Sequence, residues 1–489
     1  MDKTVVQTAY GGVRGYVKGG LHTWKGIPYA RAERFRHAQS PLAWDGVKDA
    51  LRYGPACPQL KKQPNTSEDC LCMNIWSDGT QQKKPVMLFL HGGSFREGAA
   101  SDREFDGAAL AKEGVVVVTV NYRLGVLGFM DFSFMDEAFQ PNCGLSDVVQ
   151  AIRFVKENIA AFGGDPGNIT VFGQSAGAII CSALPVMPAV SGDISKIIMM
   201  SGSPTLMHTK KQGIRLSKMY AEFMGVATAQ ALKALPAKRI AASQEDFASH
   251  CGLGAGTYAM EVDGDLLPGF PIPLAAAGKA GNIPMLIGTT REEMSFLFIK
   301  PFEKRLDIKG IFEAGTKGEG KSAKSDVPAL YAKHGERGRG MMMADLVFRL
   351  PSVWYAGAYG EHNPTWMYRY DYESPMMKAT KLHAFHSTDL PLIFGTYTAA
   401  FYKFLYSLTR FKPHFKKLSA AMRRDFVEFA TTGALPWERC EGESVPACCY
   451  DREITVAQAV DDEIKGAFRD SAFRRRSMNG ESNNLHDGA

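Results

Sequence analysis

The 489-residue sequence has no long hydrophobic run. None of its apolar stretches reaches about 18 residues, the length that a membrane-spanning helix needs. The first residues, Met1 to Thr4, lead into a polar, glycine-containing stretch without the apolar core of a secretory signal peptide. We therefore expect no membrane anchor and a location in the cytoplasm.

The sequence also lacks a strong excess of charge of one sign and any internal repeat. The net charge of +6 is spread along the chain, and 22% of the residues are charged. Proteins that bind nucleic acid usually gather basic residues on one face. We expect no nucleic-acid partner, and we expect a monomer or a weak oligomer.

Cysteine is present, but not at the spacing of a metal site. There are nine cysteines, an odd number. Cys70 and Cys72, and the adjacent Cys448 and Cys449, fit no zinc pattern and have no histidine close by in the sequence. In a large chain without a leader, such cysteines are usually reduced. We expect no metal ion and free thiols.

Short apolar, β-branched runs alternate with longer segments of helical periodicity. A helix is predicted over residues 145–158, and it ends before the stop signal Phe-Gly-Gly-Asp-Pro at 162–166. Several of the strand candidates are apolar almost throughout, which is typical of a parallel sheet with helices on both faces. The order strand, helix, strand predicts an α/β fold with one open sheet. The predicted strands are residues 86–91, 115–121, 169–173, 196–201, 284–289 and 365–370.

We expect residues 1–489 to form a single α/β domain with loop and helical insertions. Two regions have a less regular pattern. Residues 301–327 are rich in Lys, Gly and Asp and are predicted to be a surface excursion. From about residue 470 onward the chain is polar and is predicted to be a flexible tail, to about 489.

The pentapeptide Gly-Gln-Ser-Ala-Gly at 173–177 lies between a predicted strand and a predicted helical run over 176–184. This context is typical of a nucleophile elbow, in which a sharp turn lifts a serine hydroxyl clear of the sheet. Small flanking residues are needed because strand and helix approach closely. Ser175 is therefore the candidate nucleophile.

A glycine-rich loop, His-Gly-Gly-Ser-Phe at 91–95, follows the strand at 86–91. Glycines allow backbone N–H groups to converge on one point. With the N–H of Ala176, this loop would form an oxyanion hole, in which the loss of one donor typically costs roughly a hundred- to thousandfold in rate. A plain tight turn is the simpler alternative for this loop taken alone.

The catalytic acid and histidine remain open on pattern alone. A hydrolase of this kind needs both after the serine in chain order. Eight histidines follow Ser175, and composition cannot choose among them.

With these motifs the sequence resembles the type B carboxylesterases, most closely their bacterial p-nitrobenzyl esterase branch. The likeness runs from Trp-Lys-Gly-Ile-Pro-Tyr-Ala at 24–30 to Phe-Ala-Thr-Thr-Gly at 429–433, in the order of the family. Further matching segments are 67–71, 91–95, 121–125, 162–166 and the elbow. The resemblance implies an α/β-hydrolase fold with a large, mostly parallel central sheet flanked by helices.

The resemblance also selects the partners of Ser175. The segment 286–293 matches the strand leading to the family's catalytic glutamate, and this match falls on Glu293 rather than on the adjacent Glu292. The segment 384–391 matches the histidine loop and selects His386 over His383. The family's oxyanion donors map onto Gly93, Ser94 and Ala176, with Gly92 in the same loop. The resemblance implies a triad of Ser175, Glu293 and His386 with no cofactor.

Supporting contacts are implied by the resemblance as well. Arg34 and Glu68 match a structural ion pair of the family. Cys57 and Cys70 match a pair that is bridged in secreted members, and we expect free thiols here. Ser201, after its strand, and Gln174 are candidate supports of the triad.

At four positions the sequence departs from the family pattern. Gln174 replaces glutamate beside the nucleophile, and Ser94 replaces glycine or alanine in the loop. Met294 and Ser387 each replace a glycine, directly after Glu293 and His386. If the first of these glycines requires a positive φ, methionine would strain the turn.

The expected function is hydrolysis of uncharged esters of small or aryl alcohols. The same triad can act on lactones, thioesters or amides, because acyl transfer is common to all. A non-catalytic adhesion protein is the alternative from another class, although such members lose triad residues. Methionines 341–343 and the segment Phe-Leu-Phe at 296–298 could line an apolar pocket, or they could simply fill the core.

Overall fold

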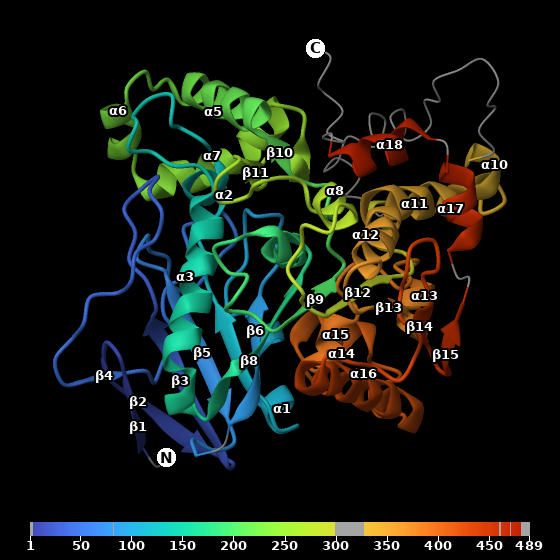
Figure 1. The fold of residues 1–489 in the computed structure, drawn as a ribbon, viewed down its shortest axis with the longest axis horizontal. Helices are drawn as coiled ribbons and strands as arrows, with labels where there is room; N and C mark the ends of the chain where they lie inside the picture. Colours follow the sequence, from blue (N-terminus) through green and yellow to red (C-terminus); the bar gives the residue numbers. More distant parts are fainter. Residues whose placement is uncertain (1–2, 82, 299–326, 459–460, 470, 481–489) are drawn as a thin grey trace.

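The computed structural model describes residues 3–81, 83–298, 327–458, 461–469 and 471–480 (Figure 1). A 13-stranded sheet runs through the molecule in the order β1-β2-β3-β5-β7-β6-β8-β9-β12-β13-β14-β15, with β4 paired to β2. Its strands are β1 (Lys3–Thr8), β2 (Gly11–Lys18), β3 (Leu21–Pro28), β4 (Val47–Asp49), β5 (Cys72–Ser77), β6 (Lys84–Leu90), β7 (Val116–Val120), β8 (Gly164–Gln174), β9 (Lys196–Met200), β12 (Met285–Thr290), β13 (Thr365–Tyr370), β14 (Ala447–Tyr450) and β15 (Ile454–Ala457).

The centre of the sheet is parallel and its edges are antiparallel. The strands from β7 through β6, β8, β9, β12 and β13 to β14 pair in parallel. The path β1-β2-β3-β5-β7 and the pair β14-β15 are antiparallel. A separate parallel pair consists of β10 (His208–Thr209) and β11 (Glu261–Val262). This arrangement confirms the predicted α/β fold with a large, mostly parallel sheet.

All six strands that the sequence predicts are present, as β6, β7, β8, β9, β12 and β13. They are six of the seven parallel strands at the centre of the sheet and are buried on both faces, so their apolar runs are nearly continuous. The seventh, β14, is also buried but was not predicted. In β6, for example, Val86, Leu88 and Leu90 belong to one hydrophobic core, and Met87 and Phe89 belong to the core on the opposite face. Successive side chains of a strand point to opposite faces, so one apolar run supplies both cores.

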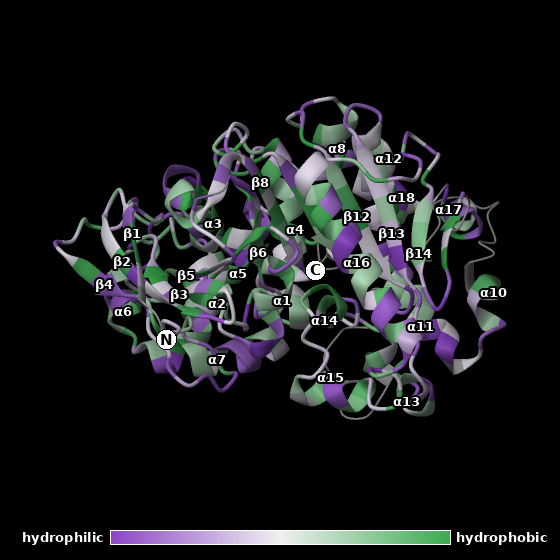
Figure 2. Cartoon of the chain, turned by 90° about the horizontal axis from the view of Figure 1, so that it is seen from below, coloured by the Kyte–Doolittle hydropathy of each residue, from purple (hydrophilic) through white to green (hydrophobic). Residues whose placement is uncertain are grey.

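Helices cover both faces of the sheet. The first core includes residues of α3 (Cys143–Asn158), α4 (Ala176–Ala183), α8 (Pro271–Ala276) and α12 (Leu350–Gly360). The second core includes residues of α1 (Ala108–Ala111), α14 (Leu390–Ile393) and α16 (Pro413–Thr432). Figure 2 shows bands of hydrophobic and hydrophilic residues along α16, as expected for a helix that buries one face. The predicted helices over 145–158 and 176–184 are thus confirmed as α3 and α4.

The remaining helices lie around this framework (Figure 1). No helix among the described residues is long and apolar enough to cross a membrane. These helices are α2 (Gly125–Phe129), α5 (Lys210–Met224), α6 (Ala229–Ala234), α7 (Ala237–His250), α10 (Val327–Ala332), α11 (Glu336–Ala344), α13 (Pro375–Ala379), α15 (Ala400–Leu405), α17 (Asp462–Phe468) and α18 (Ala472–Asn479), with a π-helical turn at Asp345–Arg349 before α12.

The prediction of a flexible tail is wrong for residues 471–480. Ser471 caps α18 by accepting a hydrogen bond from the N–H of Arg474. On the same helix Phe473 is buried, with its ring 5.6 Å from that of Trp354. The partly buried Met478 of α18 packs against two hydrophobic clusters as well, and the polar composition of the segment conceals both apolar contacts. The predicted excursion at 301–327, apart from its last residue, and the end of the tail lie outside the described residues.

The connections that follow the parallel strands meet at one edge of the sheet. The glycine loop follows β6, Ser175 follows β8 and Glu293 lies just beyond β12. His386 lies in the segment after β13. Parallel strands present their carboxyl ends at the same edge, which is where open α/β sheets form their ligand sites.

Candidate active site

Ser175 occupies a strained turn between β8 and α4. Its φ of 56° and ψ of −123° lie outside the regions favoured by residues with a side chain. Its N–H donates to Met200 O over 2.9 Å. A Cβ atom on Gly173 would lie 2.4 Å from the carbonyl carbon of Gly177, and one on Gly177 would lie 2.0 Å from Leu90 O. Only glycine fits at either side of this elbow.

Glu293 and His386 form a direct pair. His386 Nδ1 lies 2.6 Å from Glu293 Oε2, and the His386 N–H donates to Glu293 O over 3.1 Å. The other carboxylate oxygen of Glu293 accepts the N–H of Thr290 over 2.7 Å. Glu293 is fully buried, so its orientation is set by these contacts. The structure thus brings together the acid and the histidine that the resemblance selects.

The second ring nitrogen of His386 contacts Gln174. Gln174 Nε2 lies 3.1 Å from His386 Nε2 and donates to Ser387 Oγ over 2.7 Å. Because Nδ1 faces the carboxylate of Glu293, a neutral imidazole presents its lone pair at Nε2, and the amide N–H is the matching donor. Among the described residues, Ser175 Oγ forms no hydrogen bond with His386 Nε2. Hydrogen bonds of a catalytic site are often completed only when substrate binds.

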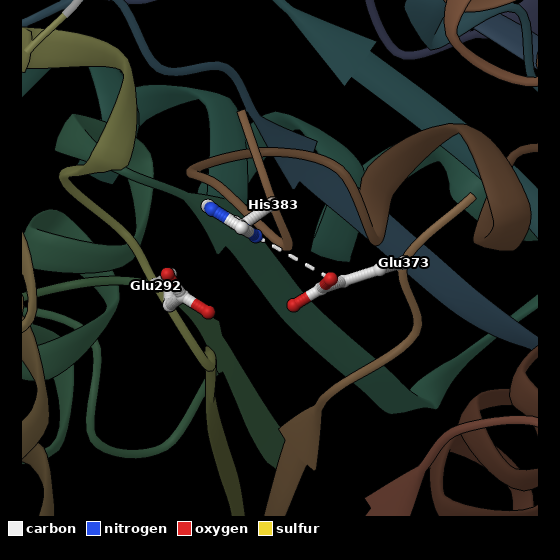
Figure 3. Close-up of side chains that lie close together, drawn as sticks. All are labelled: Glu292, Glu373 and His383. Carbon is white, nitrogen blue, oxygen red and sulfur yellow. Dashed lines mark hydrogen bonds and ion pairs between the residues drawn. The ribbon is translucent and has the colours of Figure 1, made fainter. Parts of the chain in front are cut away.

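Glu292 belongs to a different cluster, although it precedes Glu293 directly. Arg337 forms a two-pronged ion pair with Glu292, with one N–H···O distance of 2.8 Å, and also contacts Glu373 at 3.4 Å. Glu373 in turn lies 3.4 Å from His383 Nδ1 (Figure 3). Glu292, Glu373 and His383 lie close enough together to offer the donor set of a cation site. In the structure, however, the positive charge beside Glu292 is supplied by Arg337.

The glycine loop packs directly against the elbow. A Cβ atom on Gly92 would lie 2.8 Å from Ser175 Cβ, and Gly93 has a φ of 115°. Ser94 adopts a φ of 53°, so serine occupies a left-handed conformation here. No acceptor among the described residues takes the backbone N–H of Gly93, Ser94 or Ala176. These N–H groups are therefore free to meet a ligand.

His91 supports this loop from beneath, a role that the sequence reasoning did not assign. Its Nδ1 contacts Gly92 O at 2.8 Å, and its ring stacks on Tyr122 with centroids 4.5 Å apart. Tyr122 also donates its hydroxyl to His91 O over 2.6 Å. Burial lowers the pKa of His91 to about 4, which keeps the ring neutral at pH 7.

A cavity of about 420 Å³ connects these groups. Phe348 lies beside the imidazole of His386, with ring centroids 4.8 Å apart. The polar wall contains Gly92, Gly93, Ser94, Gln174, Ser175, Ala176, His386 and Ser387. Apolar residues of the lining include Phe95, Ile179, Leu206, Leu253, Met294, Phe296, Leu346, Val347, Phe348, Leu390 and Phe473. Charged residues of the lining are Lys61, Glu97, Asp102 and Glu104. The site is thus a mainly apolar pocket in which the polar groups include those around Ser175 and this charged set.

Methionines 341–343 are not part of this lining. Met342 and Met343 are buried in two small hydrophobic clusters, so core packing is the correct reading for them. Phe296 does line the cavity, whereas the side chains of residues 297 and 298 lie outside those described. Met294 is absent from the residues with positive φ, so the strain considered for it does not arise. Ser387, in contrast, has a φ of 71°.

The supporting contacts suggested by the sequence differ in their outcome. Arg34 and Glu68 form the expected ion pair, with Arg34 Nε 2.6 Å from Glu68 Oε2. All nine cysteines, Cys57 and Cys70 included, are free thiols. Ser201 is fully buried with a φ of 53°, and its hydroxyl has no polar partner among the described residues. A supporting role for Ser201 therefore stays a prediction.

Asp389 is a buried carboxyl group beside the triad that the sequence reasoning did not single out. It accepts a hydrogen bond from Tyr368 over 2.8 Å. Burial, with the nearby charge of Glu293, raises the pKa of Asp389 to about 6. Its place three residues after His386 was the only available signal.

The mostly parallel sheet and the elbow define this chain as an α/β-hydrolase. The family model described as the carboxylesterase family matches residues 2–446. The para-nitrobenzyl esterase of Bacillus subtilis (strain 168) is 36% identical over 493 residues, which cover 95% of this chain and 98% of that protein. Neuroligin-2 of Mus musculus is 35% identical over 348 residues, covering 59% of this chain and 41% of its own length. A solved structure of a PNB esterase matches with a TM-score of 0.85 at 34% identity, covering 95% of this chain and 99% of that one. The chain therefore belongs to the carboxylesterase family and is a carboxylic-ester hydrolase.

Proposed function

We propose that this protein is a serine carboxylesterase that hydrolyses uncharged esters of small or aryl alcohols through an acyl-enzyme on Ser175. One observation carries the proposal: Ser175, the His386–Glu293 pair and the free N–H groups of the glycine loop converge on one apolar cavity. A nucleophile, a base oriented by an acid, and oxyanion donors within one pocket are the parts that acyl transfer requires.

In the acylation step, Ser175 Oγ attacks the ester carbonyl carbon while His386 Nε2 takes its proton. The carbonyl oxygen becomes an oxyanion and accepts hydrogen bonds from the N–H groups of Gly93, Ser94 and Ala176. Glu293 holds Nδ1–H and stabilises the imidazolium. The intermediate collapses as His386 protonates the departing alcohol oxygen, which leaves the acyl group on Ser175.

In the deacylation step, water attacks the acyl carbonyl and His386 again accepts the proton. The same N–H groups stabilise the second oxyanion. Collapse of this intermediate releases the carboxylic acid and returns the proton to Ser175 Oγ. Only side chains, backbone N–H groups and water take part, so the reaction as proposed uses no cofactor.

The hydrogen bond between Gln174 and His386 must break before this cycle can begin. The lone pair at Nε2 accepts from the Gln174 amide in the absence of substrate. For catalysis the same lone pair accepts from Ser175 Oγ. Because Gln174 also donates to Ser387, its amide keeps a partner when His386 turns toward the serine. We propose that Gln174 and Ser387 support the resting histidine, whereas Ser175, His386 and Glu293 perform the chemistry.

The character of the pocket supports a substrate without charge at its acyl end. The wall around Ser175 includes Phe95, Ile179, Leu206, Met294 and Phe348, which exclude water from the ester group. An acyl or aryl group would bury its apolar surface against these side chains. Lactones, thioesters and amides remain alternative substrates for the same triad.

We also propose a reducing compartment, such as the cytoplasm, as the place of action. All nine cysteines are free, and Cys70 is buried in contact with Cys57. The hydrogen bond with Cys57 and burial both raise the pKa of the Cys70 thiol, which disfavours the reactive thiolate. Cysteines of proteins in reducing compartments usually stay in this form.

A panel of p-nitrophenyl esters of increasing acyl length tests the proposed activity. We expect the wild type to release p-nitrophenol fastest from short-chain esters and Ser175→Ala to lose nearly all turnover. Retained hydrolysis in Ser175→Ala would overturn the mechanism. A maximum at long acyl chains would instead assign the enzyme to lipid esters.

A further inference from the structure

An exposed apolar patch lies on α15 and the turn after it. We call Phe401, Phe404, Leu408 and Phe411 the aromatic patch. Their side chains are 51%, 50%, 59% and 71% exposed, respectively. Single exposed hydrophobic residues are ordinary, but four within eleven positions concentrate exposed apolar surface on one short segment. Such a surface indicates contact with an apolar phase or a partner.

The charged residues of the segment that carries the aromatic patch have one sign, although the half-buried Glu104 of another segment lies near Tyr402 on the inner side of α15. The sequence has no acidic residue between Asp389 and Asp425. Asp389 is fully buried. Exposed lysines in and after the patch are Lys403, Lys412, Lys416 and Lys417, and Lys378 and Lys381 lie on and after the neighbouring α13. Arg423 and Arg424 do not add to this surface, because they pair with Glu113 and Asp425.

The patch lies next to the catalytic cavity. On the inner side of α15, Tyr402 lines the cavity and donates its hydroxyl to Ser387 O over 3.3 Å. The ring of Phe401 lies 6.2 Å from that of Phe385, the residue before His386. Figure 2 shows α15 and α13 together at one edge of the molecule, away from the bulk of the sheet. One face of α15 therefore borders the active site while the other is exposed.

We propose that the aromatic patch and its lysines dock the enzyme on an anionic phospholipid surface. The aromatic and leucine side chains would enter the boundary between headgroups and acyl chains, and the lysines would pair with headgroup phosphates. A second copy of this chain fits less well, because a two-fold contact through this patch would place lysines against lysines. Docking requires no turnover, whereas delivery of membrane-dissolved esters to Ser175 rests on the proposed function.

Vesicle co-sedimentation tests the docking directly. The probes are vesicles of phosphatidylcholine alone and vesicles of phosphatidylcholine mixed equally with phosphatidylglycerol. We expect the wild type and Ser175→Ala to bind the anionic vesicles and to bind the neutral vesicles weakly or not at all. Binding to the anionic vesicles should decrease as the salt concentration rises. Binding by Ser175→Ala separates docking from catalysis, so each can fail alone.

Two double variants remove the two components of the surface. Phe404→Ser/Phe411→Ser should weaken binding at least about tenfold, because each phenylalanine loses its apolar burial. Lys412→Glu/Lys416→Glu should abolish the preference for anionic vesicles, and acids in the first turn of α16 are compatible with the helix dipole. Matched controls are Phe223→Ser on α5 and Lys18→Glu on β2, both exposed and distant in sequence from the patch.

Hydrolysis of a water-dissolved p-nitrophenyl ester should stay unchanged in all four variants, which shows that they fold. Equal binding to both vesicle types would overturn the proposal. Undiminished binding by Phe404→Ser/Phe411→Ser would also overturn it. A dimer that this variant disrupts, without vesicle binding by the wild type, would reassign the patch to self-association.

Discussion

At the scale of single residues, two departures from the family pattern meet in space. Ser387 holds a left-handed conformation that costs a residue with a side chain about 1 kcal/mol. Its hydroxyl accepts the Gln174 amide over 2.7 Å, and such a hydrogen bond contributes about 1 kcal/mol. The contact offsets the strain and holds the amide against His386 Nε2. Gln174 and Ser387 are thus best understood as one arrangement.

Replacing Gln174 by glutamate should shift the pH dependence of hydrolysis. The amide donates to the lone pair of neutral His386, whereas a carboxylate would favour the imidazolium form. More of the variant would therefore be protonated and inactive at mildly acidic pH. We expect the acid limb of the kcat/KM profile of Gln174→Glu to move up by about one pH unit. Ser387→Ala changes no charge and should leave the acid limb of the kcat/KM profile in place. An unmoved acid limb in Gln174→Glu would refute the contact between Gln174 and His386.

The adjacent acids Glu292 and Glu293 should differ sharply when each is replaced by glutamine. Glu293→Gln loses the carboxylate at His386 Nδ1, and we expect kcat to fall about a thousandfold or more. Glu292→Gln affects a partner, Arg337, that is 41% exposed and keeps Glu373, so activity should stay within a few-fold of the wild type. Steady-state kinetics on both variants decides the matter. The reverse outcome would reassign the acid of the triad.

At the scale of elements, the sequence is most informative where a buried strand is a nearly continuous apolar run. Six of the seven parallel strands at the centre of the sheet were predictable because both of their faces are apolar, whereas the short parallel strand β14 and the antiparallel β5, although fully buried, were missed. The edge strands β1–β4, of which β4 pairs in parallel with β2, have mixed, partly exposed faces and give no such signal. The elbow and the glycine loop were also predictable, because glycine is required there by close packing. In contrast, α18 is mostly polar, packs through Phe473 and the partly buried Met478, and was missed.

The partners of Ser175 could not be derived from pattern because they are distant in the chain. Glu293 and His386 are separated by 93 residues, and Gln174 and Ser387 by 213. Only the convergence of loops after different strands brings them together. The family resemblance supplied Glu293 and His386, and nothing in the sequence predicted the Gln174–Ser387 contact.

The elbow should tolerate no added methyl group at Gly177. Its Cβ would lie 2.0 Å from Leu90 O, so Gly177→Ala must push α4 away from β6. We expect a loss of about 1–3 kcal/mol in the free energy of unfolding and a large fall in kcat. Gly192→Ala is the control, since its Cβ would meet nothing within 4 Å. Wild-type Tm and kcat in Gly177→Ala would contradict the described packing.

At the scale of the whole molecule, the sheet is the frame on which both cores and the site depend. One core on each face fixes the parallel strands, and the strands fix the loops at their carboxyl ends. The protonation of buried polar groups beneath these loops therefore affects the free energy of unfolding of the whole protein. His91 is the clearest case, because it is neutral, fully buried and packed under the glycine loop.

The buried His91 should make unfolding sensitive to acid. Its pKa is lowered from about 6.5 to about 4 in the folded protein, because burial disfavours the charged ring. The stability associated with the neutral ring is thus present above about pH 6.5 and is lost as the pH falls toward 4. This shift corresponds to roughly 3 kcal/mol. Urea unfolding of the wild type and His91→Gln across this range should give a smaller pH dependence in the variant; equal slopes would exclude His91 as the source.

The central claim is that Ser175 is the nucleophile, and covalent labelling tests it most directly. Diethyl p-nitrophenyl phosphate transfers a diethylphosphoryl group to an activated serine and releases p-nitrophenol, and peptide mass spectrometry locates the group. We predict one label per chain, on the peptide containing Ser175, with a matching loss of esterase activity and no label in Ser175→Ala. A label on another residue that accompanies the loss of activity, or an active enzyme fully labelled at Ser175, would contradict the account.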